Sequence, residues 1–358
     1  MNRKLLVIIL VLTVFGLIVL SSAGIVDSQK KFGSPYYYLT HQLLYGIIPG
    51  LIGMFIISRI DYRFWKKISL FILMVALALM IMIFMPGFGH GLKGATRWIN
   101  LGVLSFQPAE ILKLSLIIYL AAWFRSRDER SKKWSYGMMP FLIILAFVAL
   151  LLFLQPDIGT LIIVSFISLG VYFMAGPSYK QFAGIILVLF LALSAIIVVE
   201  PYRFERLKTF WDPSADPRGA SYQINQSLIS IGSGGLFGVG YNNSSQKQGG
   251  FLPEVIGDSI FAIIAEELGL IGAAFTVGLF GALCFFLTMI AKNASDKFGA
   301  LLVMGINIWI MSQAFVNIAA ITGLVPLTGI PLPFISYGGT AIAVLLSGMG
   351  IVFNVAKD

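Results

Sequence analysis

The sequence predicts an all-α protein that crosses a membrane about ten times and forms a single domain over residues 1–358. Two observations support this fold class. Hydrophobic residues make up 58% of the chain and charged residues only 11%, whereas a soluble protein carries about 25% charged residues. The apolar runs are also long: Leu5–Ala23 alone is roughly the 20 residues that span a bilayer. This run is too long for the core of a cleaved signal peptide, and more runs follow it.

The expected spans follow from apolar runs of membrane-crossing length. They lie near 5–24, 38–58, 68–86, 107–124, 138–154, 157–176, 182–199, 259–290, 299–322 and 339–355. Pro49 falls inside one of them, which membrane helices tolerate. The loops near 87–106, 200–258 and 323–338 face one side, and the loop 200–258 is the longest. Long loops on a rigid scaffold often carry function.

Lysines and arginines are more frequent on the side of the N-terminus, most densely between Arg125 and Lys133. Cytoplasmic ends of membrane proteins collect these residues, so both termini are expected in the cytoplasm and the three loops outside. The net charge of +9 therefore gives no reason to expect nucleic acid. The histidines His41 and His90 are far apart in sequence and Cys284 is the single cysteine, which argues against a His/Cys metal site.

Four carboxylates mark the boundary between the long loop and the next apolar run: Glu254, Asp258, Glu266 and Glu267. Ionisable groups in or beside a bilayer are costly and usually have a functional reason, so this stretch is expected to be a site. Asp258 would otherwise cap the helix that follows it. Glu266 and Glu267 lie too deep in the run to act as caps.

Other polar residues leave two interpretations open. Arg203 and Arg206 either face an anionic headgroup, for which arginine is well suited, or pair with nearby acids. Asp157 either caps a helix or reaches the site. Glu110 and Lys113 share one helix face at i,i+3 and either fix helix packing or serve transport or catalysis.

The glycine-rich segment 232–240 lacks a preceding strand and a following Lys-Ser or Lys-Thr pair. We therefore expect tight backbone turns there, which glycine permits, and no nucleotide site.

Several motifs together resemble the SEDS family (shape, elongation, division and sporulation) of bacterial integral membrane proteins. They occur in the family's order over nearly the whole chain. The matching blocks are Ala95-Thr-Arg-Trp98, Phe106-Gln-Pro-Ala-Glu110-Ile-Leu-Lys113, Gln155-Pro-Asp-Ile-Gly-Thr160, Pro201-Tyr-Arg-Phe-Glu-Arg-Leu207, Tyr222-Gln-Ile-Asn-Gln-Ser227, Ile231–Gly240, Leu252-Pro-Glu254 and Pro331–Gly339.

The resemblance implies a peptidoglycan glycosyltransferase in the bacterial cytoplasmic membrane. Such a protein polymerises lipid II (undecaprenyl-pyrophosphoryl disaccharide-pentapeptide) at the outer face, together with a class B penicillin-binding protein transpeptidase, during division or elongation. Asp258 matches the family's essential acid, although Ile256, Gly257 and Ser259 replace its usual His, Thr and Phe neighbours. The stretch Ser244-Ser-Gln-Lys247 favours the FtsW-like division branch over the RodA-like elongation branch.

For this chemistry we expect Asp258 to be the catalytic base, because a carboxylate near a low-dielectric boundary is suited to accept a proton. The residues expected to bind substrate are Arg97, Trp98, Asp157, Arg203, Arg206, Lys247 and Glu254. Asp258 and Glu254 are also candidate ligands for Mg²⁺ or Mn²⁺, although no sequence pattern requires a metal. The alternative is a lipid II transporter without bond-forming activity, which the buried Glu110 and Lys113 favour.

Overall fold

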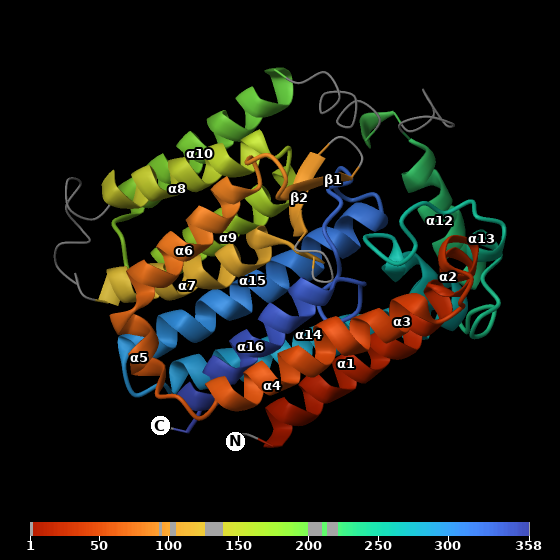
Figure 1. Ribbon diagram of the computed structural model, residues 1–358, viewed down its shortest axis with the longest axis horizontal. Helices are drawn as coiled ribbons and strands as arrows, with labels where there is room; N and C mark the ends of the chain where they lie inside the picture. Colours follow the sequence, from red (N-terminus) through yellow and green to blue (C-terminus); the bar gives the residue numbers. More distant parts are fainter. Residues whose placement is uncertain are drawn as a thin grey trace.

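The computed structural model describes residues 3–92, 95–100, 105–125, 139–199, 210–212 and 221–357. Long helices pack side by side along one direction, with both chain ends at one end of the bundle and α2, α12 and α13 at the other (Figure 1). The helices are α1 Arg3–Ala23, α2 Ile25–Phe32, α3 Tyr37–Gln42, η1 Leu43–Ile47, α4 Ile48–Ile57, α5 Tyr62–Lys67, α6 Ser69–Met82, α7 Pro108–Arg125, α8 Met139–Leu154, α9 Ile158–Met174, α10 Tyr179–Val199, α12 Tyr222–Gly234, α13 Ser245–Gln248, α14 Ile260–Lys292, α15 Lys297–Ile321 and α16 Gly339–Val355.

Each predicted span contains a helix, and the all-α class of a polytopic membrane protein is confirmed. Four helical stretches in the described part of the chain are long and apolar enough to cross a bilayer by length and composition alone: Arg3–Ala23, Tyr37–Ile57, Ile260–Lys292 and Lys297–Ile321. The total number of spans remains a prediction.

The second span is not a regular α-helix throughout, because the π-helical turn η1 separates α3 from α4. Pro49 lies in the first turn of α4. Proline has no N–H and its ring crowds the carbonyl four residues earlier, so a wider turn just before it removes both conflicts.

The loop predicted at 87–106 contains a small antiparallel sheet in the order β1–β2–β3. Its strands are β1 Gly89–Leu92, β2 Ala95–Asn100 and β3 Ser105–Phe106. His90 pairs with Trp98, and Ile99 pairs with Phe106. The glycine content of this segment concealed the short strands.

The span predicted at 259–290 is broken at Gly269, whose backbone is non-helical (φ 66°, ψ −165°). A Cβ atom at Gly269 would lie 2.4 Å from the backbone nitrogen of Gly238, so only glycine permits this approach. The N–H of Leu270 donates to Gly235 O at 2.9 Å. The segment 235–240 thus supplies partners to the backbone groups that the break releases, as irregular backbone at membrane depth requires. The glycines at 235, 238 and 240 have positive φ, which confirms the expected turns.

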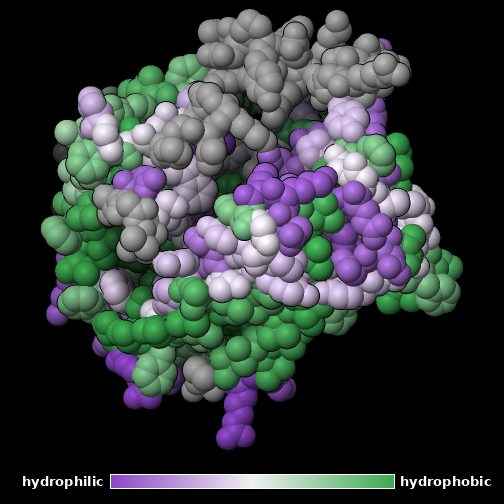
Figure 2. Space-filling view, turned by 45° about the vertical axis from the view of Figure 1, so that its right-hand side comes forward, coloured by the Kyte–Doolittle hydropathy of each residue, from purple (hydrophilic) through white to green (hydrophobic). Residues whose placement is uncertain are grey.

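Helix α15 is the centre of the bundle and packs against α7, α9, α14 and α16. Its Trp309 is fully buried, as are Tyr172 of α9 and Phe124 of α7. Large apolar side chains such as Phe71 and Phe190 point outward instead, as expected of a surface in contact with lipid. In the space-filling view, hydrophilic residues gather on the end that comes forward, above a region of hydrophobic ones (Figure 2).

Candidate active site

Asp258 lies at the end of a loop, directly before Ser259 and α14. Its side chain is half-buried. Gln223, in the first turn of α12, donates from Nε2 to Asp258 Oδ1 and to Ser259 Oγ, both at 3.1 Å. The start of α12 therefore lies against the carboxylate, although the two residues are 35 positions apart.

Helix α15 contacts the backbone of Asp258 through a hydrogen bond. Asn317 donates from Nδ2 to Asp258 O at 2.8 Å and to Ile330 O at 2.7 Å. Asn317 is only 1% exposed, so its amide is removed from water, where losing a partner is costly. One amide group therefore connects the loop of Asp258 to the loop before α16.

The loop before α16 also runs alongside the residues that precede Asp258. Ser336 Oγ donates to Gly257 O at 2.7 Å, and the N–H of Tyr337 donates to Ile256 O at 2.9 Å. Gly329 is close to the carboxylate itself, since a Cβ at that position would lie 4.0 Å from Asp258 Oδ2. Two loops that the sequence presents separately thus form one site.

Tyr337 joins this site to α3 through its phenol, which is 2.9 Å from His41 Nδ1. Burial, with nearby Tyr37 and Tyr38 adding to it, raises the pKa of the Tyr337 phenol above its ordinary value. The phenol therefore remains neutral over the physiological range, and this contact acts as a hydrogen bond.

Glu110 and Lys113 of α7 form a buried ion pair at 2.8 Å. Lys113 Nζ also donates to Gln313 Oε1 of α15 at 3.0 Å and lies 5.1 Å from the centre of the Trp309 ring. Gln313 Nε2 donates in turn to Pro331 O at 3.0 Å. The pair is thus linked to the same loop that flanks Asp258.

The second oxygen of Glu110, Oε2, is buried and has no hydrogen-bond partner among the described residues. Glu110 lines a cavity of about 20 Å³ together with Gln313, Ser336 and Tyr337. A cavity of this size has room for about one water molecule.

Arg97 and Asp157 lie together at the link between α8 and α9. The Arg97 guanidinium donates to the carbonyls of Gln155 and Pro156, and its Nη1 lies 3.9 Å from Asp157 Oδ1. Asp157 caps α9, because its carboxylate accepts from the Thr160 N–H at 3.2 Å and hydroxyl at 2.9 Å. The structure thus shows Asp157 as the cap of α9, which is one of the two roles considered for it.

The remaining residues predicted to bind substrate have different environments. Glu254 is exposed, has a positive φ of 50° and starts the turn that ends at Gly257. Trp98 is half-buried in β2. Arg203 and Arg206 lie outside the described residues.

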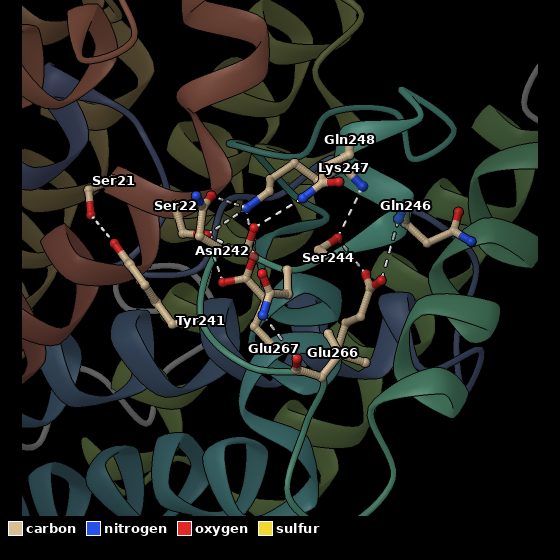
Figure 3. Close-up of polar contacts among 12 residues, drawn as sticks. Ser21, Ser22, Tyr241, Asn242, Ser244, Gln246, Lys247, Gln248, Glu266 and Glu267 are labelled. Atoms are coloured by element: carbon tan, nitrogen blue, oxygen red, sulfur yellow. Dashed lines mark hydrogen bonds and ion pairs between the residues drawn. The ribbon is translucent and has the colours of Figure 1, made fainter.

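Lys247, expected to bind substrate, is instead buried in an ion pair with Glu267 at 2.7 Å. Its Nζ also donates to Ser22 Oγ of α1 at 2.7 Å and to Asn242 Oδ1 at 2.9 Å (Figure 3). With 3% of the residue exposed, Lys247 has no surface for a substrate. Its contacts hold the loop around it to α1 and α14.

Glu266 holds the same loop from its other side (Figure 3). Its carboxylate accepts from Ser230 Oγ at 2.6 Å, Ser244 Oγ at 2.7 Å and the Ser245 N–H at 2.9 Å. Glu266 and Glu267 thus form a loop anchor, defined here as these two carboxylates with Lys247 and the serines they contact. Glu266 and Glu267, two of the four boundary acids, therefore have structural roles that need no substrate.

Sequence reasoning missed the amides Gln223, Gln313 and Asn317. A signal was present for two of them, because Gln313 and Asn317 are four residues apart in an apolar span and so share one helix face. Buried amides in such a position need partners, but the sequence does not identify those partners.

Comparison with known proteins agrees with this architecture. A family model described as "Cell cycle protein", covering FtsW, RodA and SpoVE, matches residues 3–358. A probable peptidoglycan glycosyltransferase FtsW from Nitrosomonas europaea is 37% identical over 97% of this chain and 90% of its own. The stage V sporulation protein E of Bacillus subtilis is 36% identical over 99% of this chain and 96% of its own.

Two solved structures share the fold over the full length. A peptidoglycan synthase complex, described as coordinating polymerization and crosslinking, aligns with a TM-score of 0.82 and 26% identity over 100% of this chain and 98% of that one. The rod-shape-determining protein RodA of Thermus thermophilus aligns with a TM-score of 0.74 and 25% identity over 100% and 97%. The chain belongs to the FtsW/RodA/SpoVE family of cell cycle proteins.

Proposed function

We propose that this protein is a peptidoglycan glycosyltransferase that polymerises lipid II into glycan strands. The observation that carries the proposal is Asp258, a half-buried carboxylate with a firmly held backbone at the end of an apolar bundle. Several relatives at 35–37% identity are named peptidoglycan glycosyltransferases. Their FtsW names favour the division branch over the elongation branch.

Asp258 acts as the general base in the proposed reaction. It removes the proton from a sugar hydroxyl of one saccharide as the hydroxyl oxygen forms a bond to the anomeric carbon of another. The bond from that carbon to the lipid-linked diphosphate breaks, and the diphosphate leaves with the electron pair. A positioned base contributes about 10²–10⁴-fold to such a step.

The leaving diphosphate needs positive charge to stabilise it. We assign this role to Arg203 and Arg206, on the sequence evidence given above. Arg97 is a weaker candidate, because its guanidinium already contacts the Gln155 and Pro156 carbonyls and Asp157. We assign Glu254 and Trp98, which are both at least partly exposed, to contacts with the saccharide. The polyprenyl chain would lie along the apolar surface of the bundle.

A divalent cation fits this site only with help from substrate. Within the described ranges, no group of three or more His, Cys, Asp or Glu side chains is placed to hold a metal ion. Asp258 and Glu254 would supply at most two carboxylate ligands, and the diphosphate oxygens and water would supply the rest, as is usual for Mg²⁺. The ion would add positive charge beside the leaving group. Loss of activity in a chelator, restored by Mg²⁺ or Mn²⁺, is the test.

The active face is proposed to lie outside the cytoplasmic membrane. Both chain ends lie at one end of the bundle and the loops around α12 and α13 at the other (Figure 1), and the lysine and arginine bias puts the termini inside. We further propose a class B penicillin-binding protein as partner, since one structural neighbour belongs to a synthase complex that couples polymerization to crosslinking.

The transport alternative depends on ionisable groups inside the bundle. Lys113 contacts Glu110 and Gln313, while Glu266 and Glu267 hold a loop. These contacts give all four residues structural partners, which favours chemistry at the outer end over a path through the middle.

The deciding experiment uses Asp258→Asn, purified with the transpeptidase partner and supplied with lipid II. We expect glycan polymer to fall by about 10²–10⁴-fold, with an unchanged thermal unfolding midpoint, because the side chain is half-exposed. The matched control is Asp27→Asn, which removes an exposed carboxylate paired with Lys31. Polymer at the wild-type rate would reject Asp258 as base. The wild-type protein is also reconstituted in lipid vesicles with lipid II. Translocation of the lipid II headgroup without formation of polymer would favour the transporter.

A further inference from the structure

We infer that Asn317 is a positioning residue for Asp258, and that Gln313 extends this support to the Glu110–Lys113 pair. The inference rests on the proposed function, because it assigns Asn317 a role in the reaction that Asp258 performs. It concerns residues of α15, which the sequence motifs do not include.

The first support is geometric. Asn317 Nδ2 donates to Asp258 O at 2.8 Å and to Ile330 O at 2.7 Å, so one buried side chain from the central helix contacts two loops. The carbonyl belongs to Asp258 itself. A shift at this atom therefore moves the carboxylate relative to its substrate.

The second support is continuity along α15. Gln313 lies one turn before Asn317 and donates to Pro331 O at 3.0 Å, next to the Ile330 that Asn317 holds. Gln313 Oε1 accepts from Lys113 Nζ at 3.0 Å and from Trp309 Nε1 at 2.9 Å. Hydrogen bonds thus run from α7 through α15 to the catalytic loop.

The third support is the chemistry of Asp258. General base catalysis requires the carboxylate within hydrogen-bond reach of the hydroxyl, and a misplacement of about 1 Å can cost about 10²-fold in rate. Gln223 and the 329–337 loop contact the site from the outer end. Asn317 reaches it from the inner side of the bundle, where packing against α7, α9, α14 and α16 makes α15 rigid.

The same helix offers a matched control in Asn307. It is 3% exposed, against 1% for Asn317, and also donates through Nδ2, to Cys284 O at 3.3 Å and Thr288 Oγ1 at 3.0 Å. These partners are on α14, far along the chain from Asp258. Replacing either asparagine by leucine removes the donors while keeping the number of side-chain heavy atoms and the branch at Cγ.

The experiment compares Asn317→Leu with Asn307→Leu in the full-length protein with its partner and lipid II. We expect Asn317→Leu to lower kcat at least tenfold with KM changed less than twofold, because the base is displaced while the substrate surfaces remain. Asn307→Leu should keep kcat within twofold. The thermal unfolding midpoints of the two variants should fall by similar amounts.

Two outcomes overturn the inference: kcat within twofold of wild type for Asn317→Leu, or equal loss of kcat in both variants. If Asn317→Leu does not fold, Asn317→Asp replaces it against Asn307→Asp, because aspartate has the same shape but no amide donors. The wild-type protein and Asp258→Asn, assayed in parallel, distinguish failure of the proposed function from failure of the inference about Asn317. Absence of polymer from the wild-type protein rejects the proposed function, and polymer from Asp258→Asn at the wild-type rate rejects Asp258 as the base. An inactive Asp258→Asn with an active Asn317→Leu rejects only this inference.

Discussion

The two ends of the acidic stretch 254–267 use carboxylates in opposite ways. Glu266 and Glu267 are buried and receive hydrogen bonds from the serines and Lys247 around them. Asp258 is half-buried and is held through its backbone carbonyl by Asn317. The difference teaches that a carboxylate at a membrane boundary becomes structural when its oxygens are enclosed by donors.

Burial sets the energy scale of this comparison. Each charge removed from water loses several kcal/mol of hydration, and only close partners and hydrogen bonds recover it. The loop anchor meets that requirement within the protein. A half-exposed carboxylate keeps part of its contact with solvent and remains accessible to a reactant.

The largest expected effect tests the anchor. Glu267→Ala leaves Lys247 buried without its counter-ion and should lower the free energy of unfolding by about 3–5 kcal/mol. Thermal unfolding in detergent measures it. The control is Lys31→Ala, which breaks the exposed Lys31–Asp27 pair at 2.8 Å and should change stability by under about 1 kcal/mol. Similar losses in both variants would contradict the role given to burial.

A smaller loss of unfolding free energy is expected at Gly238, which lies in the segment that contacts the break in α14. Gly238 has φ 81°, and a Cβ there would lie 2.2 Å from Glu267 O. Gly238→Ala should therefore destabilise the protein by more than about 1 kcal/mol. Gly232→Ala is the control, because it lies in α12 with nothing within 4 Å of the added Cβ, and alanine favours helix. Equal unfolding midpoints for the two variants would count against the close approach.

The smallest expected effect concerns the hydrogen bond to the Asp258 carboxylate. Gln223→Ala removes the amide that donates to Asp258 Oδ1 and should lower kcat by about tenfold, the equivalent of one modest hydrogen bond. Stability should change little, because Gln223 is only partly buried. Gln226→Ala, on the same helix, is the control in the polymerisation assay. A loss confined to Gln226→Ala would show that α12 orients the site by another route.

The sequence predicted the architecture well because membrane helices follow from composition. The positions of the helices required only hydropathy. The pairing of Glu110 with Lys113 followed from i,i+3 spacing and is present. The capping interpretation of Asp157 followed from helix polarity and is also present.

The errors share one cause, which is contact between distant segments. Lys247 was expected to bind substrate, but Glu267 of the next helix pairs with it and buries it. Asn317 was missed because its role depends on Asp258 and Ile330, which lie on either side of it in the chain. Gly269 appeared to be an ordinary residue within a span, and the backbone of 236–238 makes it a break. The predictions for Arg203 and Arg206 lie outside the described residues.

The break at Gly269 has a mechanical consequence. The piece of α14 before it, residues 260–268, begins two residues after Asp258 and packs against α12. The remainder of α14 belongs to the bundle that lipid surrounds. We therefore expect a displacement of α12 by a partner outside the bundle to reach the carboxylate through Gln223, which donates to Asp258 Oδ1 at 3.1 Å.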